Sequence, residues 1–248
     1  MMTPDVVAGR LSQHILRDAW GTPDPKGGCD GRTPAGWWLR FYAEVVSQAF
    51  LHRFSIRPRH LDTYLELWPL EVRLRQRHGF VHLQSYLSDH AEPKLTWLYS
   101  HRDPAAGEAI WSADPEVVEL RERAAPHVFG NLLIRPVRVE LLAEHSDDPH
   151  RTVCLRRYRI VGDWAAFLGV WRRIVQVRER HGFRCLFAVS DEPTDTFTWA
   201  FDFVGTWADF TDVQRPYYAD PERVELRGVF DYMADYSLDP ARRLQVSG

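Results

Sequence analysis

Four polar side chains on predicted strands could act chemically on a bound molecule. They are His52 and His82 in the first half of the chain, and Arg156 and Tyr158 in the second half. Histidine can transfer protons near neutral pH, and an arginine beside a tyrosine hydroxyl can hold an anionic or phenolic group. We take these four as the candidate catalytic residues. The alternative is structural: a strand histidine is more often simply hydrogen-bonded in place, Arg156 could form an ion pair, and Tyr158 could pack against helices.

An aromatic stripe supplies the candidate substrate-binding residues. Trp97 and Tyr99 are two residues apart on one predicted strand, as are Trp199 and Phe201 on another, so each pair shares a strand face. Aromatic walls suit planar ligands, although core packing against helices explains the same residues. The sequence leaves open which strand face lines the interior, because a shift of one residue moves every side chain to the opposite face.

Motifs of the common hydrolases, kinases and dinucleotide enzymes do not occur in the sequence. It contains no HExxH, GxSxG, Walker or GxGxxG element. Its cysteines Cys29, Cys154 and Cys185 form no CxxC pair, so neither a zinc site nor a disulfide framework is expected. Segment 145–150 holds two histidines and two aspartates that could bind a metal. Such Asp-Pro turns are common, and we expect no metal.

The chain contains two copies of one pattern. The element RHGF at 77–80 recurs at 180–183, and Thr-Trp at 96–97 recurs at 198–199. The segment ADPExVELR occurs at 113–121 and again at 219–227. Two copies are too few for a solenoid, and they indicate an intramolecular pseudo-dimer.

Each copy reads as strand, helix, strand, strand, helix and strand. In the first copy we predict strands at 50–56, 80–87, 94–99 and 132–142, and in the second copy further strands at 183–189, 197–203 and a short one at 242–246. Apolar residues recur at helical spacing from 61 to 72 and from 164 to 175. Gly79 and Gly182 suit the left-handed position after these helices, and Asp114 and Asp220 should cap the second helices.

Residues 1–49 lie outside the duplication. We predict a helix at 6–20, a loop rich in glycine and proline at 21–36, and an extra strand at 37–46. The expected organisation is an extension at 1–49, a first ferredoxin-like repeat at 50–149 and a second at 150–248.

These elements resemble the NIPSNAP-like family of the dimeric α/β-barrel superfamily. The resemblance covers residues 50–248 and is carried by the helix end RxRHGF, the Thr-Trp strand and the ADPE-opened helix. Arg156-Arg157-Tyr158 matches the Arg-x-Tyr element of that family, whereas His52-Arg53-Phe54 departs from it. The resemblance implies an α+β fold in which two tandem ferredoxin-like repeats form a pseudo-dimer around a central β-barrel.

The superfamily includes cofactor-free monooxygenases, cyclases, isomerases and haem proteins. The resemblance therefore implies a cofactor-independent cyclase, isomerase or monooxygenase of bacterial secondary metabolism, acting on an aromatic or polyketide-like small molecule in the barrel. One alternative is a haem protein with His52 or His82 as axial ligand. Another is a non-catalytic ligand-binding or interaction module. The copies differ at these positions, since His52 corresponds to Arg156 and His82 to Cys185, so one asymmetric pocket is expected.

Composition narrows the partners. The chain has 248 residues, 45% of them apolar, and a formal net charge of −3, so no basic field favours nucleic acid. No apolar run approaches the length of a membrane span, and no long apolar leader is present. We expect a cytoplasmic protein that is monomeric as a pseudo-dimer, with further homo-oligomers left open. Of its 31 basic residues 29 are arginine, which is typical of a GC-rich bacterial genome.

Overall fold

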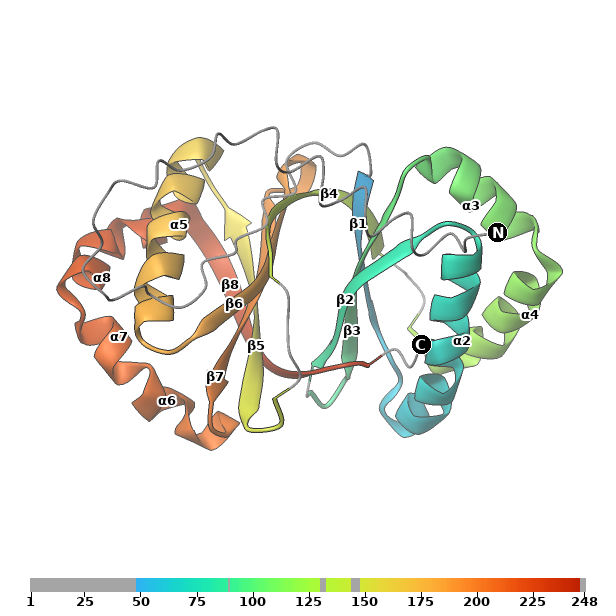
Figure 1. The fold of residues 1–248 in the computed structure, drawn as a ribbon, viewed down its shortest axis with the longest axis horizontal. Helices are drawn as coiled ribbons and strands as arrows, with labels where there is room; N and C mark the ends of the chain where they lie inside the picture. The colour runs from blue at the N-terminus through green and yellow to red at the C-terminus, as the bar shows by residue number, and fades with distance from the viewer. Residues whose placement is uncertain (1–47, 89, 130–132, 144–147, 246–248) are drawn as a thin grey trace, which may run out of the picture. The chain divides into compact units, whose positions relative to one another are not determined.

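An antiparallel sheet closes on itself to form a barrel. The computed structural model describes residues 48–88, 90–129, 133–143 and 148–245. The strands run in the order β1-β3-β2-β8-β5-β7-β6-β4 around the closed barrel (Figure 1). Their bounds are β1 Gln48–Ser55, β2 Val81–Ser88, β3 Lys94–His101, β4 Leu133–Leu142, β5 Arg151–Ile160, β6 Arg184–Asp191, β7 Thr196–Val204 and β8 Met233–Arg243.

The barrel consists of two runs of four strands with the same relative order. One run is β4-β1-β3-β2 and the other is β8-β5-β7-β6. The two runs are joined at two places: β4 pairs with β6, and β8 pairs with β2. The second join is short and extends only from the pair Tyr86–Arg243 to the pair Ser88–Ala241. All adjacent strands are antiparallel, so the described sheet has no free edge.

Helices cover the outside of the barrel on two sides (Figure 1). Beside β1–β3 lie α2 (Leu61–Arg77), α3 (Pro104–Ala113) and α4 (Pro115–Ala124), with short 3-10 turns η1 (Pro58–His60) and η2 (Ala125–His127). Beside β5–β7 lie α5 (Trp164–Arg180), α6 (Phe210–Val213), α7 (Arg215–Ala219) and α8 (Pro221–Glu225), with η3 (Glu192–Thr194), η4 (Trp207–Asp209) and η5 (Leu226–Tyr232). No helix in the described part of the chain is both long and apolar enough to cross a membrane.

The two repeated sequence elements contact each other in both halves. His78, at the end of α2, lies 2.8 Å from a carboxylate oxygen of Asp114, and His181 lies 2.9 Å from the corresponding Asp220. Each aspartate also accepts a backbone N–H of the helix that it caps, as predicted. Gly79 and its counterpart at 182 adopt φ of 83° and 80°, which confirms the predicted left-handed helix ends. The repeated histidines and aspartates therefore join helix termini.

Apolar side chains form three separate layers. Under the helices of the first half lies a cluster around Trp68 and Trp97, and under those of the second half lies a cluster around Trp171 and Trp199. The barrel interior holds a third cluster of smaller, mostly aliphatic side chains, including Leu51, Leu98, Leu155, Leu186 and Val189. Strand residues alternate between these layers.

Some predicted elements differ from the structure. The final strand was predicted at 242–246, which is wrong, because β8 spans Met233–Arg243 and pairs with β5 along most of its length. Its aspartate, serine and proline residues have low strand propensity, so backbone pairing rather than local preference forms it. Helices α3, α6 and α7 were not predicted, and the helix predicted after Asp220 is the short α8 followed by the 3-10 turn η5. The elements predicted at 6–20, 21–36 and 37–46 lie outside the described residues.

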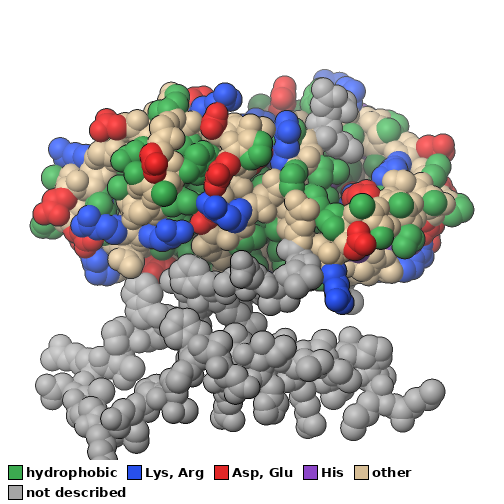
Figure 2. All heavy atoms as spheres, turned by 90° about the horizontal axis from the view of Figure 1, so that it is seen from above, with side chains coloured by type: hydrophobic (Ala, Val, Ile, Leu, Met, Phe, Trp, Pro, Cys, Tyr) green, Lys and Arg blue, Asp and Glu red, His purple; other side chains and the backbone are tan. Residues whose placement is uncertain are grey.

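The charged side chains of the described residues are mixed over the visible surface. Figure 2 shows basic and acidic side chains interspersed on the face that it presents, among exposed apolar ones. On this face the described residues form no large area of one charge.

Candidate functional site

The predicted site residues all lie between the sheet and the helices. They form two groups, one in each half: His52, His82, Trp97 and Tyr99 in the first, and Arg156, Tyr158, Trp199 and Phe201 in the second. The sequence leaves open which strand face lines the interior, and in the structure these side chains lie on the face under the helices. The alternate strand positions form the interior cluster, in which Tyr86 stacks on Phe187 at 5.6 Å among aliphatic side chains. The role of these eight residues stays a prediction.

In the first half a buried arginine is surrounded by four aromatic rings. Arg75, in the last turn of α2, is 3% exposed, and its guanidinium carbon lies 4.8 Å from the Phe80 ring centre, 5.6 Å from Trp97, 4.8 Å from Tyr99 and 4.4 Å from Trp111. Sequence reasoning missed this role, because Arg75 was noted only as part of the RxRHGF element. The available signal was that both copies of RxRHGF place an arginine, Arg75 or Arg178, shortly before a phenylalanine.

Carboxylates accompany this first arginine. Glu108 of α3 accepts a 2.8 Å hydrogen bond from Nη1 of Arg75. Glu71 lies one helical turn before Arg75 and accepts a 2.9 Å hydrogen bond from the Tyr64 hydroxyl. Burial raises the pKa of Glu71, while the charge of Arg75 opposes that rise. The first-half arginine is therefore neutralised within the protein.

His52 is packed against the same layer. It is 2% exposed, its ring lies 4.8 Å from Phe54 and 6.1 Å from Trp97, and neither ring nitrogen has a hydrogen-bond partner among the residues that the structure describes. Burial, assisted by the charge of Arg75, lowers its pKa to about 3, so the ring is neutral at pH 7. A neutral imidazole can ligate haem iron, but a haem needs open space beside the ring. The close packing of Phe54 and Trp97 fills that space, so the residues around His52 do not fit a haem.

His82 lies near the outer end of β2, beside a register shift. Its Nε2 atom is 3.1 Å from the Ser85 hydroxyl, and its ring is 6.3 Å from that of Trp97. Burial lowers the pKa of His82 to about 4, and the charge of Arg243 acts in the same direction. This histidine is also neutral at pH 7, and the hydrogen bond to Ser85 accounts for one ring nitrogen.

The second half repeats the aromatic enclosure around Arg178. This residue is 1% exposed, and its guanidinium carbon lies 5.1 Å from the Phe183 ring centre, 5.5 Å from Trp199, 4.3 Å from Phe201 and 4.2 Å from Tyr217. Its Nε and Nη1 atoms have no hydrogen-bond partner among the described residues. The buried cation therefore has aromatic neighbours but no described counter-ion.

Two more arginines lie beside it. The guanidinium carbon of Arg156 lies 5.9 Å from the centre of the Phe201 ring, and Arg156 donates a 3.2 Å hydrogen bond to the Tyr158 hydroxyl. Arg223 is 5% exposed and donates from Nε to the Tyr217 hydroxyl at 2.6 Å. None of the described carboxylates forms an ion pair with Arg156 or Arg223, so three cations share one layer.

The rings offset part of the cost of burying these cations but carry no negative charge that neutralises them. Removing a guanidinium from water costs several kcal/mol, and one cation–π contact returns about 0.5–2 kcal/mol. Arginine keeps its charge inside proteins. The arginine layer of the second half, defined as Arg156, Arg178 and Arg223, therefore has a positive potential suited to an anion.

Tyr218 is the titratable group at the outer side of this layer. Its ring is 38% exposed, and the guanidinium carbon of Arg223 lies 5.4 Å from its centre. Burial raises the pKa of the Tyr218 hydroxyl, but the charges of Arg156 and Arg178 outweigh it, so the pKa is lowered from its usual value. A phenol of this kind can exchange a proton with a bound molecule.

The cysteines of the second-half layer are poor nucleophiles. Cys154 and Cys185 are both buried. Burial raises the pKa of the Cys154 thiol to about 12 and raises that of Cys185 as well. Because the thiolate is the reactive form, these residues serve as packing groups. Among the described residues, no three His, Cys, Asp or Glu side chains gather closely enough to hold a metal; residues 145–147 of the segment considered above lie outside them.

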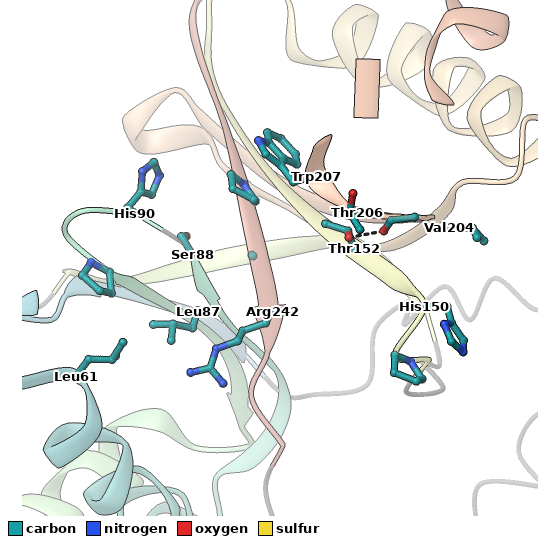
Figure 3. A pocket seen from close by; sticks show the side chains of 15 residues that line it. Leu61, Leu87, Ser88, His90, His150, Thr152, Val204, Thr206, Trp207 and Arg242 are labelled. Atoms are coloured by element: carbon teal, nitrogen blue, oxygen red, sulfur yellow. Dashed lines mark hydrogen bonds between the residues drawn. The ribbon is translucent and has the colours of Figure 1, made fainter. Parts of the chain in front are cut away.

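A separate groove of about 830 Å³ lies beside the C-terminal end of β8, at residues 240–242, and none of the predicted site residues lines it. Figure 3 shows Trp207, Thr206, Thr152 and Val204 on one wall, and His90 and His150 at opposite ends. Its one drawn hydrogen bond runs from the Thr152 hydroxyl to the Gly205 carbonyl at 2.6 Å, which is a contact between neighbouring segments. The groove therefore has no convergent polar group comparable to the arginine layer.

Comparison with known proteins identifies solved structures that have a similar fold. No known family profile matches the chain, and no curated protein is similar to it in sequence. A candidate monooxygenase of Fusobacterium nucleatum has a TM-score of 0.59 at 9% identity, over 82% of this chain and 94% of that one. A candidate monooxygenase from Lactobacillus acidophilus gives 0.55 at 10% identity, over 80% and 94%. An anthrone oxidase-like protein gives 0.52 at 9% identity, over 82% and 93%. The chain thus shares the fold of these three proteins.

Proposed function

We propose that this protein is a small-molecule enzyme that oxidises an aromatic compound with O2 in the second-half layer, without a cofactor. The observation that carries the proposal is the arginine layer beside Tyr218, in which buried cations and a titratable phenol meet an aromatic wall. The fold likeness to monooxygenase-type proteins and to an anthrone oxidase-like protein supports the choice of oxidation over cyclisation or isomerisation.

The residues suit the removal of a proton from an activated methylene. Tyr218, as its phenolate, would accept the proton, and Arg156 and Arg178 would stabilise the enolate that remains. This electron-rich anion transfers electrons to O2. The methylene loses two hydrogens and gains one oxygen atom as a carbonyl, and the second oxygen atom leaves as water, so CH2 and O2 give C=O and H2O.

We also propose that the two four-strand runs are copies of one ferredoxin-like, NIPSNAP-like unit at 50–149 and 150–248. The matching strand orders and the two four-ring enclosures at corresponding positions support this duplication. A duplicated chain can specialise one half, which agrees with a single reactive layer.

The test uses anthrone, whose activated methylene matches this chemistry. Purified protein should consume O2 above the protein-free rate and yield anthraquinone that carries one ¹⁸O atom from ¹⁸O2. Arg178→Met should lower the rate by about 100-fold, as loss of a stabilising charge commonly does. Arg75→Met, the corresponding change in the first half, is the matched control and should retain activity.

Other outcomes would favour the alternatives. Turnover that appears only after haem is added, together with a Soret band, would support a haem protein and overturn the cofactor-free proposal. Ligand protection against heat without any O2 uptake would support a binding module instead. Equal losses in Arg178→Met and Arg75→Met would show that the second-half layer is not the site.

A further inference from the structure

The two aromatic enclosures are built from corresponding residues. Arg75 and Arg178 occupy the same position in the RxRHGF element. Phe80 corresponds to Phe183, Trp97 to Trp199, Tyr99 to Phe201 and Trp111 to Tyr217, and each ring contacts its arginine. Strand register confirms the correspondence, because His52 pairs with Trp97 as Arg156 pairs with Trp199.

The charges around the enclosures do not correspond. The two carboxylates of the first half, Glu71 and Glu108, are replaced by Ile174 and Gln214. Ile174 is buried in the second-half cluster, and the Oε1 atom of Gln214 is buried without a hydrogen-bond partner. The second half has therefore lost both negative charges that neutralise its counterpart.

The second half has also gained cations at corresponding positions. Arg156 replaces the neutral His52, and Arg223 replaces Val117. Both new arginines contact rings of the same layer: Arg156 lies over Phe201 and Arg223 over Tyr217. A random loss of carboxylates would leave one unpaired arginine, whereas here Arg156 and Arg223 contact the same Phe201 and Tyr217 rings as Arg178.

We infer that the second-half layer binds the anionic group of an aromatic carboxylate or phenolate, and that the first half is a closed copy whose own Glu71 and Glu108 occupy the position of that anion. The inference rests on the proposed function for the location of the site. Arginine binds carboxylates bidentately, and the enclosing rings select an aromatic body over an inorganic ion. Each chain then binds one ligand, although it contains two enclosures.

The test compares two ligands of the same shape. Isothermal titration of the full chain with 2-naphthoate and with its neutral analogue 2-naphthamide should give one site per chain, with the naphthoate at least tenfold tighter. Equal affinities for the two ligands, or two equivalent naphthoate sites, would overturn the inference. This comparison uses the wild-type protein and so does not depend on the folding of a variant.

A charge substitution tests the origin of the asymmetry. Gln214→Glu restores the carboxylate found at the corresponding Glu108, so it should weaken naphthoate at least tenfold and leave naphthamide unchanged. Glu71→Gln, which changes only the first half, is the control and should leave the naphthoate affinity unchanged. An unaltered naphthoate affinity in folded Gln214→Glu would contradict the inference. Oxidation of anthrone without anion preference would sink this inference alone, whereas selective naphthoate binding without O2 uptake would sink only the proposed function.

Discussion

The guanidinium carbon of Arg178 lies 4.2 Å from the centre of the Tyr217 ring, in a layer where the described residues provide no counter-ion. The corresponding distance from Arg75 to Trp111 is 4.4 Å, but there Glu108 completes an ion pair. One geometry thus occurs twice with different charge balance. The proposed ligand site lies in the half that lacks the carboxylate.

The ion pair of the first half should contribute to folding. Glu108→Gln leaves the buried guanidinium of Arg75 without its closest carboxylate, so we expect a loss of about 1–2 kcal/mol in the free energy of unfolding, measured in urea. The side chain of Glu108 is 40% exposed, which keeps the loss small. The control Glu119→Gln removes an exposed pair with Arg123 at 3.9 Å and should change stability by less than about 0.5 kcal/mol. Equal effects would refute a structural role for the first-half pair.

How far the sequence predicts this molecule depends on the element. The caps at Asp114 and Asp220 and the left-handed Gly79 follow from local chemistry, so they could be predicted. Which face of each strand lies under the helices could not be predicted. Alternation gives two equivalent registers, and only the packed helices distinguish them. His52 and Arg156 were therefore singled out correctly as positions where the copies differ, but their surroundings were not predicted.

The aromatic surroundings of Arg75 and Arg178 could not be predicted from the sequence either. Arg75 and Arg178 each lie near a helix C-terminus, where a basic residue already has a local explanation. Their enclosure depends on two rings from one strand and one ring from a second helix, which are contacts distant in sequence. Comparison of Glu108 with Gln214 between the copies was the signal that could have revealed the asymmetry.

His52 should make the fold sensitive to mild acid. Its folded pKa of about 3 lies below the unfolded value of 6.5, so between these values the unfolded chain binds a proton that the native state does not. Stability should therefore fall as pH drops from 6.5 toward 3, by about 1.4 kcal/mol per pH unit at most. His52→Phe should flatten this dependence in urea titrations from pH 7 to 4, and His150→Gln, at the groove, should not. His82 contributes a residual slope in the same direction. A wild-type slope in His52→Phe would rule out this assignment.

Asp114 should act at lower pH. The backbone N–H of Glu116, and then His78, lower its pKa to about 2. A depressed carboxyl pKa stabilises the fold above the unfolded value near 3.9, and the contribution disappears as pH falls toward 2. Asp114→Asn should reduce the acid dependence of the urea midpoint between pH 4 and 2, whereas the exposed Asp62→Asn should leave it unaltered. If the urea midpoint of Asp114→Asn depends on pH between 4 and 2 as in the wild type, the contact between helix termini does not stabilise the protein.

Tyr218 should determine the pH dependence of turnover. Tyr218→Phe removes the proposed base, so kcat for anthrone should fall by about 100-fold or more, and the rise of kcat with pH should disappear. The exposed Tyr236→Phe is the matched control, and O2 uptake from pH 6 to 10 provides the measurement. If Tyr218→Phe retains the wild-type profile, another group accepts the proton.

The most direct test follows two corresponding indoles during ligand binding. The Nε1 atoms of Trp97 and Trp199, one in each half, are both buried and have no hydrogen-bond partner within the described part of the chain. In a ¹⁵N-indole spectrum, assigned with Trp97→Phe and Trp199→Phe, titration with 2-naphthoate should shift the Trp199 resonance and leave that of Trp97 in place. Equal shifts of both resonances, or a shift of Trp97 alone, would contradict a ligand site in the second-half layer.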